Sequence, residues 1–466
     1  MPPRRRAAAG RVDASPLPAH VTALLAPDAL GPGEGRAELV QTHGSYVLLG
    51  ATRVCKLKKP LDFGFLDYTT PAQRRRACEA ELQLNRRLTS DVYLRIAAVV
   101  KAPGGFALAG AGDADAAADY AVLMRRLPQA GMLDRLVERD ALSSALIARL
   151  AERLARFYRQ ADRGAAIDDG ARPAMLLTNW QENFAQTLPY VDRTLTAAQY
   201  RRIAAAAYAD LLRLRPLWRQ RIAEGRARDG HGDLRLSAVC VEGETIQIYD
   251  CIEFNERFRH ADVAADIAFL AMDLDAHGRP DLADEFVAAF MAASGDTTLG
   301  AVLPFYLCYR AYVRGKVYSF QLDEREVPPA QRRRAALTAR ARFRLAAGYA
   351  RRARPSVTLV SGDEGPLRAA VAAALASRRG AVPIEAADVT SAADQAAHWL
   401  RQGIGAVLGG PPELHELAGC LPPRTPFAMY VLGTGAMPAG ARRLAETGSV
   451  RAALGALHGL PRAARG

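Results

Sequence analysis

The chain has 466 residues, of which 50% are hydrophobic and 24% charged, which predicts a folded protein of about three structural units. The formal net charge is +13, mostly from arginine. This surplus weakly favours anionic partners such as nucleotides, nucleic acid or acidic lipid, and solvated arginine-rich helix faces are the simpler explanation. No apolar run approaches the roughly 18 residues that cross a bilayer, which argues against a membrane protein.

The six cysteines are scattered, with no CxxC pair and no cluster with histidine. This pattern predicts buried thiols in a reducing, cytoplasmic environment rather than a disulfide framework or a metal site. The N-terminus also lacks the apolar core of a secretory signal. The arginine runs at 74–76 and 332–334 come without a recognised nucleic-acid motif, and only 7% of residues are aromatic. Few stacking platforms are therefore available, and nucleic acid is not expected as a partner.

Residues 1–32 are predicted to form a basic arm and a short amphipathic helix, PAHVTALLA. Residues 33–125 then alternate apolar with polar side chains between glycines such as Gly44, a pattern typical of an antiparallel meander. This stretch is interrupted by one predicted helix that begins at Pro71. The apolar positions among the arginines of that helix are Ala77, Leu82 and Leu88. We therefore expect a β-rich lobe.

Residues 126–352 are predicted to be mostly helical, with one acidic hairpin, HGDLRLSAVCVEGETIQIYD, at 231–250. Pro355 marks a change, because SVTLVSGDEGPLRAAVAAALA has the order strand, glycine turn, helix. Three later apolar runs predict buried parallel strands: GAVPIEAADV, GIGAVLGG and PFAMYVLG. The fold class that follows is an α+β bilobal protein with a β-rich lobe and a helical lobe, followed by a small α/β domain over 353–466.

The acidic hairpin suggests phosphoryl transfer, which needs clamped phosphates, a bridging metal and a carboxylate that orients the attacking hydroxyl. Asp233 can accept that proton, and Asp250, at the end of the next strand, offers Mg²⁺ a hard oxygen ligand. Taken alone, an HGD triplet more often marks a simple turn. The upstream residues supply the complementary parts, since Lys56 could neutralise phosphates and Glu81 could hold its ammonium group.

A second feature of the meander is the hairpin THGSYVLLG, where Gly44 allows close approach and the Ser45 hydroxyl could lie over the phosphates of ATP. Lys58 lies two positions after Lys56 on the same face of the strand, so it remains an alternative phosphate ligand. The interpretation requires that the lysine of the sheet-rich part and the two acids of the helical part meet in one cleft.

Residues 38–350 resemble the aminoglycoside phosphotransferase-like branch of the protein-kinase-like fold, in particular the group in which this domain precedes a P-loop kinase-like domain. The matching stretches occur in the family's order: THGSYVLL, CKLKKPLDFGFLDY, CEAELQLNRRL, VLMRRLP, HGDLR, IYDCIEFNERFRHADVAADIAFLAMDLD and YRAYVRGKV. The resemblance implies ATP and Mg²⁺ as cofactors. It also implies the strand-lysine and helix-glutamate roles for Lys56 and Glu81, the catalytic carboxylate for Asp233 and the metal ligand for Asp250. Met124 falls where the adenine-binding hinge would run.

The resemblance further predicts that Asp266 supports the catalytic segment rather than touching substrate. The chain departs from the family's HGDxxxxN pattern, because Ala238 stands where asparagine would supply a second metal ligand. Ser237, Glu253 or water are candidate replacements. This loss predicts weaker metal binding or a misplaced γ-phosphate.

A Walker A loop, GxxxxGK[ST], is also absent from SVTLVSGDEGPLRAAV. Gly362 and Gly365 persist, but the later glycine, lysine and hydroxyl positions are Leu367, Arg368 and Ala369. Asp363 and Glu364 add negative charge to the loop, where it would repel phosphate. We therefore predict a degenerate α/β domain kept for packing or for contact with a protein partner.

Two functions follow from these patterns. The first is an ATP- and Mg²⁺-dependent phosphotransferase acting on a hydroxyl of an unidentified small molecule; the alternative is a pseudokinase, a nucleotide-binding scaffold without turnover. The segments LLTNWQENFAQTLPYV and FNERFRHADV are expected near the acceptor. A chain this basic is not an obvious receptor for polycationic aminoglycosides.

Overall fold

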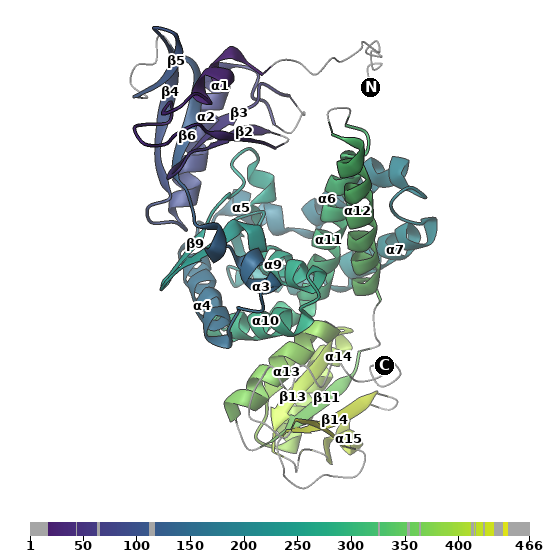
Figure 1. Ribbon diagram of the computed structural model, residues 1–466. Helices are drawn as coiled ribbons and strands as arrows, with labels where there is room; N and C mark the ends of the chain where they lie inside the picture. Colours follow the sequence, from purple (N-terminus) through teal and green to yellow (C-terminus); the bar gives the residue numbers. More distant parts are fainter. Residues whose placement is uncertain are drawn as a thin grey trace. The chain divides into compact units, whose positions relative to one another are not determined.

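The computed structural model describes residues 17–42, 44–62, 66–110, 117–324, 327–351, 355–362, 365–411, 414, 416–422, 425–432 and 441–445. The chain divides into two compact units. The first comprises Met1–Arg86, Ser90–Arg126 and Tyr318–Leu337, and the second Arg87–Thr89, Leu127–Val317 and Thr338–Gly466. Figure 1 labels the elements, from purple at the N-terminus to yellow at the C-terminus.

The first unit is built on a six-stranded antiparallel sheet with the order β1-β2-β3-β6-β4-β5. Its strands are β1 (Glu38–Gln41), β2 (Ser45–Leu49), β3 (Arg53–Lys58), β4 (Tyr93–Ala102), β5 (Gly105–Gly110) and β6 (Ala117–Arg125). The long central strands are rich in valine, alanine and other apolar residues that pack well on a pleated surface. The predicted sheet-rich first part is confirmed.

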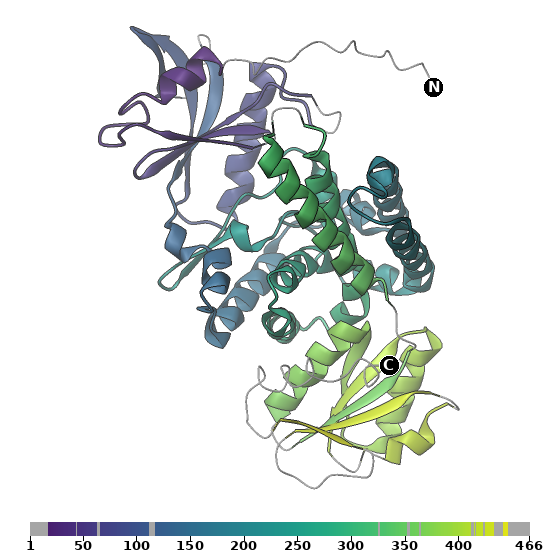
Figure 2. The ribbon, with the colours of Figure 1, turned by 45° about the vertical axis from the view of Figure 1, so that its right-hand side comes forward.

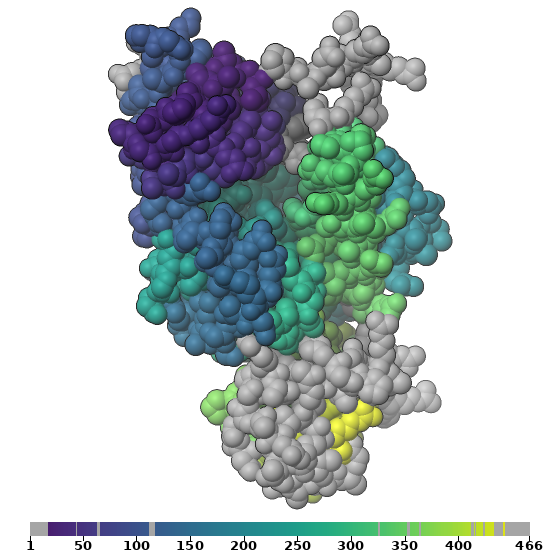
Figure 3. Space-filling model, in the orientation of Figure 1, coloured from purple at the N-terminus to yellow at the C-terminus, as the bar shows by residue number. Residues whose placement is uncertain are grey.

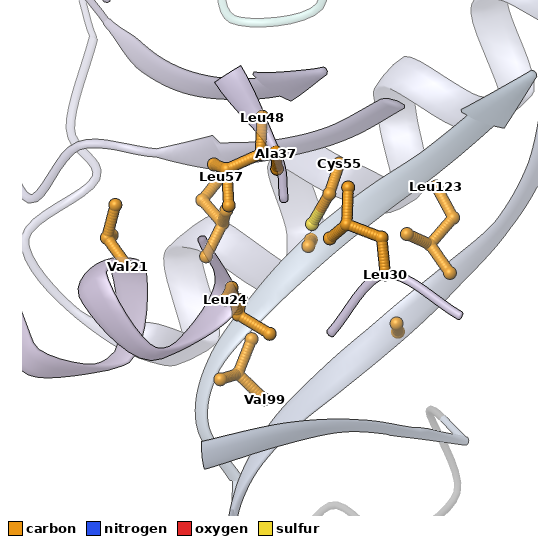
Figure 4. Packing of buried hydrophobic residues seen from close by; sticks show 11 residues of the cluster. Val21, Leu24, Leu30, Ala37, Leu48, Cys55, Leu57, Val99 and Leu123 are labelled. Atoms are coloured by element: carbon orange, nitrogen blue, oxygen red, sulfur yellow. The ribbon is translucent and has the colours of Figure 1, made fainter. Parts of the chain in front are cut away.

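One face of this sheet carries the apolar core of the unit (Figure 4). Helix α1 (Ala19–Leu24) contributes Val21 and Leu24, both fully buried, so the short helix predicted for the arm is part of this core. The other members come from the following loop and the strands: Leu30, Ala37, Leu48, Cys55, Leu57, Ala97, Val99, Ala121 and Leu123. In the space-filling view the surface of the earliest described residues is purple (Figure 3).

Helix α2 (Pro71–Arg86) packs against β6 and β4, and it begins at Pro71 as predicted. Of the apolar positions named from the sequence, Leu88 is buried but lies beyond the end of the helix, and Ala77 and Leu82 are half-buried. The buried stripe of the helix consists of Arg74, Cys78, Glu81 and Asn85. The spacing is helical, but the stripe is polar because it faces polar partners. Arg74, for example, donates from Nε to Asp119 Oδ1 at 2.6 Å.

The second unit begins with a predominantly helical part (Figure 2), as predicted. Its helices are α3 (Leu133–Glu138), α4 (Ser144–Gln160), α5 (Ala165–Ala171), α6 (Pro173–Thr187), α7 (Ala197–Arg213), α8 (Arg215–Ala223), α9 (Ala264–Ala276), α10 (Pro280–Ser294), α11 (Leu299–Phe320) and α12 (Pro329–Tyr349). The ends of α11 and α12 between Tyr318 and Leu337 group with the first unit. Two short antiparallel pairs are inserted: β7 (Ala227–Asp229) with β10 (His260–Asp262), and β8 (Val239–Glu242) with β9 (Thr245–Ile248).

A parallel α/β part completes the second unit. Its five strands run in the order β12-β13-β11-β14-β15. The elements are β11 (Val357–Ser361), α13 (Gly365–Arg379), β12 (Ala381–Glu385), α14 (Val389–Arg401), β13 (Gly405–Gly410), α15 (Leu417–Cys420), β14 (Phe427–Leu432) and β15 (Arg442–Ala445). The predicted strands are therefore present. Their near-continuous apolar sequences reflect burial on both faces, as in other parallel sheets.

Helix α13 joins this α/β part to the helical part by packing on α10. Arg378 of α13 donates to Asp275 at 2.9 and 3.0 Å and forms a close ion pair with Asp284 of α10. The Tyr349 hydroxyl donates to the same Asp275 carboxylate. A bidentate arginine–carboxylate pair of this kind adds geometric specificity to the joint.

Among the described residues, no helix is long and apolar enough to cross a membrane. All six cysteines are free thiols, and five of them are buried as predicted. The prediction is wrong for Cys420, which is exposed at the end of the short helix α15.

A buried charge triad holds the helical part together. Arg221 of α8 is fully buried and donates to both carboxylate oxygens of Asp262 at 2.7 Å and to Asp296 at 2.7 and 2.9 Å. The Thr298 hydroxyl accepts a further bond at 2.7 Å. Burial opposes ionisation of Asp296, but the charge of Arg221 holds its pKa below the ordinary value. The paired guanidinium thus offsets the cost of burying two carboxylates.

Arg221→Ala should lower the free energy of unfolding by about 3–5 kcal/mol, because it leaves Asp262 and Asp296 buried without their cation. Urea unfolding followed by tryptophan fluorescence measures the change. Arg219→Ala, at an exposed position of the same helix, is the matched control and should shift stability by no more than about 0.5 kcal/mol. Similar stabilities for the two variants would contradict the structural role of the triad.

Candidate functional site

Two lysines of β3 point to the same carboxylate of α2 in the first unit. Alternate residues of β3 face opposite sides of the sheet, so Cys55 and Leu57 enter the apolar core while Lys56 and Lys58 face α2. Lys56 Nζ lies 2.7 Å from Glu81 Oε1, and Lys58 Nζ lies 2.5 Å from Glu81 Oε2.

The two lysines differ in their access to solvent. The Glu81 side chain is fully buried, the Lys58 side chain is 2% exposed and the Lys56 side chain is 15% exposed. The Lys58 ammonium also lies 5.5 Å from the centroid of the Tyr68 ring, a favourable position for a cation. Lys56 therefore has the more accessible amine, and Lys58 is an internal member of the same charge cluster.

The hairpin that contains Gly44 and Ser45 lies next to these lysines in the sheet. Ser45 pairs with Lys58 across β2 and β3, and the Gly44 carbonyl accepts from the Lys59 N–H at 2.8 Å. Ser45 is buried, and its N–H donates to the Thr42 hydroxyl at 3.0 Å. Among the described residues, a Cβ built on Gly44 would meet Leu66, at 3.9 Å, which is ordinary van der Waals contact.

Met124 is buried in β6, between Val54 of β3 and Tyr93 of β4. The N–H groups that follow it are engaged, because Arg125 N donates to Val92 O at 2.8 Å and Arg126 N donates to Thr52 O at 2.7 Å. The main stretch of the second unit begins at Leu127, directly after Arg126. Met124 therefore lies near the point at which the chain leaves the first unit.

In the second unit, the loop 230–233 is held by one buried carboxylate, Asp266 of α9. Asp266 accepts from His231 N at 2.7 Å and from Gly232 N at 3.0 Å. The Tyr158 hydroxyl adds a third bond, at 3.0 Å. Two glycines make this close approach feasible. A Cβ on Gly230 would lie 2.6 Å from Asp266 Oδ2, and Gly232 has a φ of +86°, which favours glycine. The predicted supporting role of Asp266 is seen directly in these contacts.

His231 is buried in this loop as a neutral imidazole. Its Nε2 lies 2.9 Å from the Tyr249 carbonyl, which can only accept, so Nε2 carries the proton. Its Nδ1 then accepts from the Asp233 N–H at 3.3 Å. Burial, opposed by the charges of Asp266 and Asp233, lowers the pKa of His231 below its ordinary value. The neutral ring thus connects Tyr249 to the backbone of Asp233.

Asp233 itself is partly exposed and paired with an arginine that the sequence analysis did not single out. Arg235 donates from Nε to Asp233 Oδ2 at 2.9 Å, and its Nη2 lies 2.8 Å from the same oxygen. Arg235 Nη1 donates to Ser237 Oγ at 3.0 Å. The signal available in the sequence was a charged residue two positions after the aspartate. Ala238, in contrast, is buried, with 2% of its surface exposed.

Asp250 follows β9 in an exposed, left-handed backbone conformation, with a φ of +65°. Aspartate tolerates this region better than most residues, and such strain often occurs at functional positions. Its charge acts on both His231 and Arg235, so Asp233 and Asp250 belong to one electrostatic neighbourhood. No group of three or more His, Cys, Asp or Glu within the described ranges could enclose a metal by itself. An exposed carboxylate does fit Mg²⁺ that is held mainly by nucleotide phosphates and water.

Lys56 and Glu81 lie in the first unit, and Asp233 and Asp250 lie in the second. Within each unit the predicted residues are neighbours in space. The sequence analysis did not anticipate that Lys58 shares Glu81 with Lys56, since it treated the two lysines as alternatives. A pattern of lysines at i and i+2 on a strand, opposite one buried glutamate, was the available signal.

The segments predicted near the acceptor are joined by an ion pair between Glu182 and Arg257. Lys316 of α11 donates to Asn183 Oδ1 at 2.6 Å, and burial lowers its pKa to about 8. A cavity of about 450 Å³ lies beside this region. Its lining comes from α5, the start of α6 and the segment after Asp250: Ala166, Asp169, Gly170, Met175, Phe254, Asn255, Glu256, Arg257 and His260.

At the Walker-like position, Arg368 of α13 is engaged with its own protein. Its Nη1 donates to the Gly362 carbonyl at 2.7 Å, and its Nη2 lies 3.4 Å from Glu385 Oε2. Gly362 has a φ of +157° and packs against Leu432 so closely that a Cβ would lie 2.9 Å away. Asp363 and Glu364 lie outside the described residues.

Residues 53–305, more than half of the chain, match the family model described as the phosphotransferase enzyme family. Uncharacterized protein Rv2004c of Mycobacterium tuberculosis and Uncharacterized protein Mb2027c of Mycobacterium bovis are each 33% identical to the chain over 350 residues. Those alignments cover 75% of this chain and 67% of each relative.

Two solved structures are also similar. A choline/ethanolamine kinase family protein from Mesorhizobium loti has 13% identity and a TM-score of 0.40, covering 71% of this chain and 97% of that one. An ADP-bound aminoglycoside phosphotransferase has 11% identity and a TM-score of 0.36, covering 67% and 95% respectively. Because these TM-scores are below 0.5, the family assignment rests on the sequence matches.

Lys58→Met should lower the free energy of unfolding by about 1.5–3 kcal/mol, because the buried Glu81 carboxylate loses a charge-assisted hydrogen bond. Lys56→Met should cost less, because its amine is the more hydrated of the two in the folded protein. Urea unfolding of both variants, each carrying the same substitution in the same strand, provides matched measurements. A larger loss for Lys56→Met would contradict the assignment of Lys58 as the internal lysine.

The protein should lose stability between about pH 7.5 and pH 5.5 through His231. The unfolded imidazole takes up a proton near its ordinary pKa of 6.5, whereas the buried ring takes it up only at lower pH. The stability that His231 contributes is therefore fully present above the pKa of the unfolded imidazole. It is lost as the pH falls toward the pKa of the buried ring. Urea unfolding of the wild type and of His231→Gln at both pH values tests this; equal losses in the two proteins would rule out a buried neutral imidazole.

Proposed function

Because the chain belongs to the phosphotransferase enzyme family, we propose that it transfers the γ-phosphoryl group of ATP, used with Mg²⁺, to a hydroxyl of a small polar molecule. The observation that carries this proposal is the braced loop that presents Asp233. Its backbone is fixed through Asp266, while the Asp233 side chain remains 25% exposed. Phosphoryl transfer depends mainly on such positioning and on electrostatic stabilisation.

On the nucleotide side, Lys56 is proposed to pair with the α- and β-phosphates, and Glu81 to hold its amine in position. The Lys56 side chain is held by Glu81 and is 15% exposed, which supports contact with a phosphate group. Gly44 and Ser45 are proposed to cover the phosphates and Met124 to lie beside the adenine. These three roles are supported by the family resemblance.

On the acceptor side, Asp233 Oδ2 is committed to Arg235, which leaves Oδ1 to receive a hydrogen bond from the acceptor hydroxyl. The hydroxyl oxygen forms a bond to the γ-phosphorus as the bond from that phosphorus to the β,γ-bridging oxygen breaks. The hydroxyl proton passes to Asp233, and ADP leaves with the bridging oxygen. Asp250 would hold Mg²⁺, which, when bound, neutralises the charge on the transferring phosphates.

The acceptor is proposed to occupy the cavity bounded by α5 and the segment after Asp250. Its lining includes charged residues of both signs, Asp169, Glu256 and Arg257, together with the polar His260. This mixture supports a polar acceptor with a few directed hydrogen bonds, and it does not select for a polycation.

The pseudokinase alternative is favoured by two specific observations. Ala238 offers no oxygen at the position where the family supplies a second ligand, and Arg235 engages the carboxylate of Asp233. A nucleotide-binding scaffold without turnover needs neither group. Binding and turnover must therefore be measured separately.

Residues 353–466 are proposed to be a P-loop-like domain that has lost nucleotide binding. The contact of Arg368 with the Gly362 carbonyl supports this, because the cation at the Walker lysine position is used internally. The joint between Arg378 and the acids of the helical part supports a packing role for the domain.

Asp233→Asn should reduce turnover by about 10²–10⁴-fold while leaving ATP binding nearly unchanged, because the amide cannot accept the proton. Turnover is measured as ADP release with a panel of polar hydroxyl compounds, and binding by thermal shift. Asp162→Asn, at an exposed position of the same unit, is the matched control and should leave both unchanged.

The thermal-shift titration also separates the two functions. A ligand that binds only the folded state at a hundred times its Kd adds about 2.7 kcal/mol of stability. An enzyme should show this gain with ATP and Mg²⁺ together, and Lys56→Met should reduce it. A gain that is independent of Mg²⁺, without turnover, would favour the scaffold, and no gain at millimolar ATP would exclude the enzyme.

A further inference from the structure

Arg235 places a fixed positive charge beside the proposed catalytic carboxylate. Its Nε and Nη2 lie 2.9 and 2.8 Å from one oxygen, Asp233 Oδ2. The third nitrogen, Nη1, donates to Ser237 Oγ at 3.0 Å. All three nitrogens of the guanidinium are therefore engaged at the site. The side chain is only 22% exposed, so the charge is held in place by the surrounding protein.

Further acids surround this guanidinium. The charge of Asp233, against the opposing effect of burial, raises the pKa of Arg235, and Asp273 and Asp250 add to the effect. Asp273 is anchored in turn, since it accepts from Leu236 N and from Arg342 Nη2, each at 3.2 Å. The guanidinium thus occupies a position at which negative charge from three separate segments converges. A divalent ion would be attracted to the same position.

Ser237 and Ala238 offer little to a second ion. Ser237 Oγ already accepts from Arg235, so its role as a replacement metal ligand is disfavoured. Ala238 is buried, and its backbone is fixed because Tyr249 N donates to the Ala238 carbonyl at 2.9 Å. The Tyr249 hydroxyl likewise donates a hydrogen bond to the Ser237 carbonyl, at 2.9 Å.

We propose that Arg235 is a resident cation that takes the place of the second divalent ion of a two-metal phosphotransferase site. This inference rests on the proposed function and deepens it. In the related kinase chemistry, two Mg²⁺ ions are held by an aspartate and by the asparagine of the catalytic loop. Here the asparagine is replaced by Ala238 and the charge is supplied by Arg235, a positioning residue, so one divalent ion is bound with the nucleotide.

The replacement is chemically consistent with transfer. A guanidinium is charged at every pH of interest and has a rigid planar set of donors, so it needs no ion from solution. By holding Oδ2, it also orients Asp233 and leaves Oδ1 toward an acceptor. The substitution therefore accounts for Ala238 and Arg235 together, whereas a simple loss of the ligand accounts only for Ala238.

The test counts Mn²⁺ ions bound to the full chain with a non-hydrolysable ATP analogue, by electron paramagnetic resonance. The wild type and Arg235→Lys, which keeps the charge, should bind one ion per nucleotide. Arg235→Gln with Ala238→Asn should bind two, and Ala238→Asn alone should remain at one because the arginine still repels the ion. Two ions in the wild type, or in Ala238→Asn alone, would overturn the proposal.

Ala238 is buried, so a second measurement avoids substituting it. Arg235→Gln alone should lower the Kd of Mn²⁺ in the nucleotide complex about two- to tenfold, because a nearby positive charge is removed. Arg235→Lys should stay within about twofold of the wild type. An unchanged or weaker affinity in Arg235→Gln would overturn the resident cation. Absence of nucleotide binding by the wild type would instead overturn the proposed function, and this inference with it.

Discussion

The hydrogen bonds from the loop backbone to Asp266 are the constraint on which the helical part of the site depends. A buried carboxylate is costly unless its lone pairs are used, and here they are used by His231 N, Gly232 N and the Tyr158 hydroxyl. Arg310 of α11 lies 3.4 Å from the same carboxylate. The conformation of the loop is thus tied to the position of α9. Because Asp233 follows directly, its side chain is presented from a backbone with little freedom.

Helix α9 carries this constraint further into the second unit. Asp266 lies in its first turn, Asp273 bonds Leu236 N beside the loop, and Asp275 receives Arg378 of the α/β part. Three acids on one helix therefore contact the loop at one end and α13 at the other. Helix α9 therefore both orders the loop and anchors the α/β part. This shared helix is a physical reason for the loop and the α/β part to occur in one protein.

The charge clusters of the two units differ in a way that suits their proposed roles. In the first unit, two strand lysines share the buried carboxylate of Glu81. Around Arg235 three carboxylates contribute negative charge, and one of them, Asp273, is also paired with Arg342 at 3.2 Å. In both clusters a carboxylate holds a cation in position. Preorganised charge of this kind is the main source of transition-state stabilisation in phosphoryl-transfer sites.

The sequence by itself predicted a β-rich part followed by a helical part, because strand alternation and glycine turns depend on local periodicity. Its ordered motifs and the family resemblance also selected Lys56, Glu81, Asp233 and Asp250 as candidate site residues. It also placed the start of α2 at Pro71 and the parallel strands of the α/β part. Only the tertiary structure decided which face of α2 is buried, since its polar stripe is stabilised by partners on other elements. For the same reason, only the tertiary structure showed that Lys58 shares Glu81 with Lys56. It also showed that the charges of acids from three segments act on Arg235. Hydrogen bonds and charges act across space, and a pattern along the chain does not contain those distances.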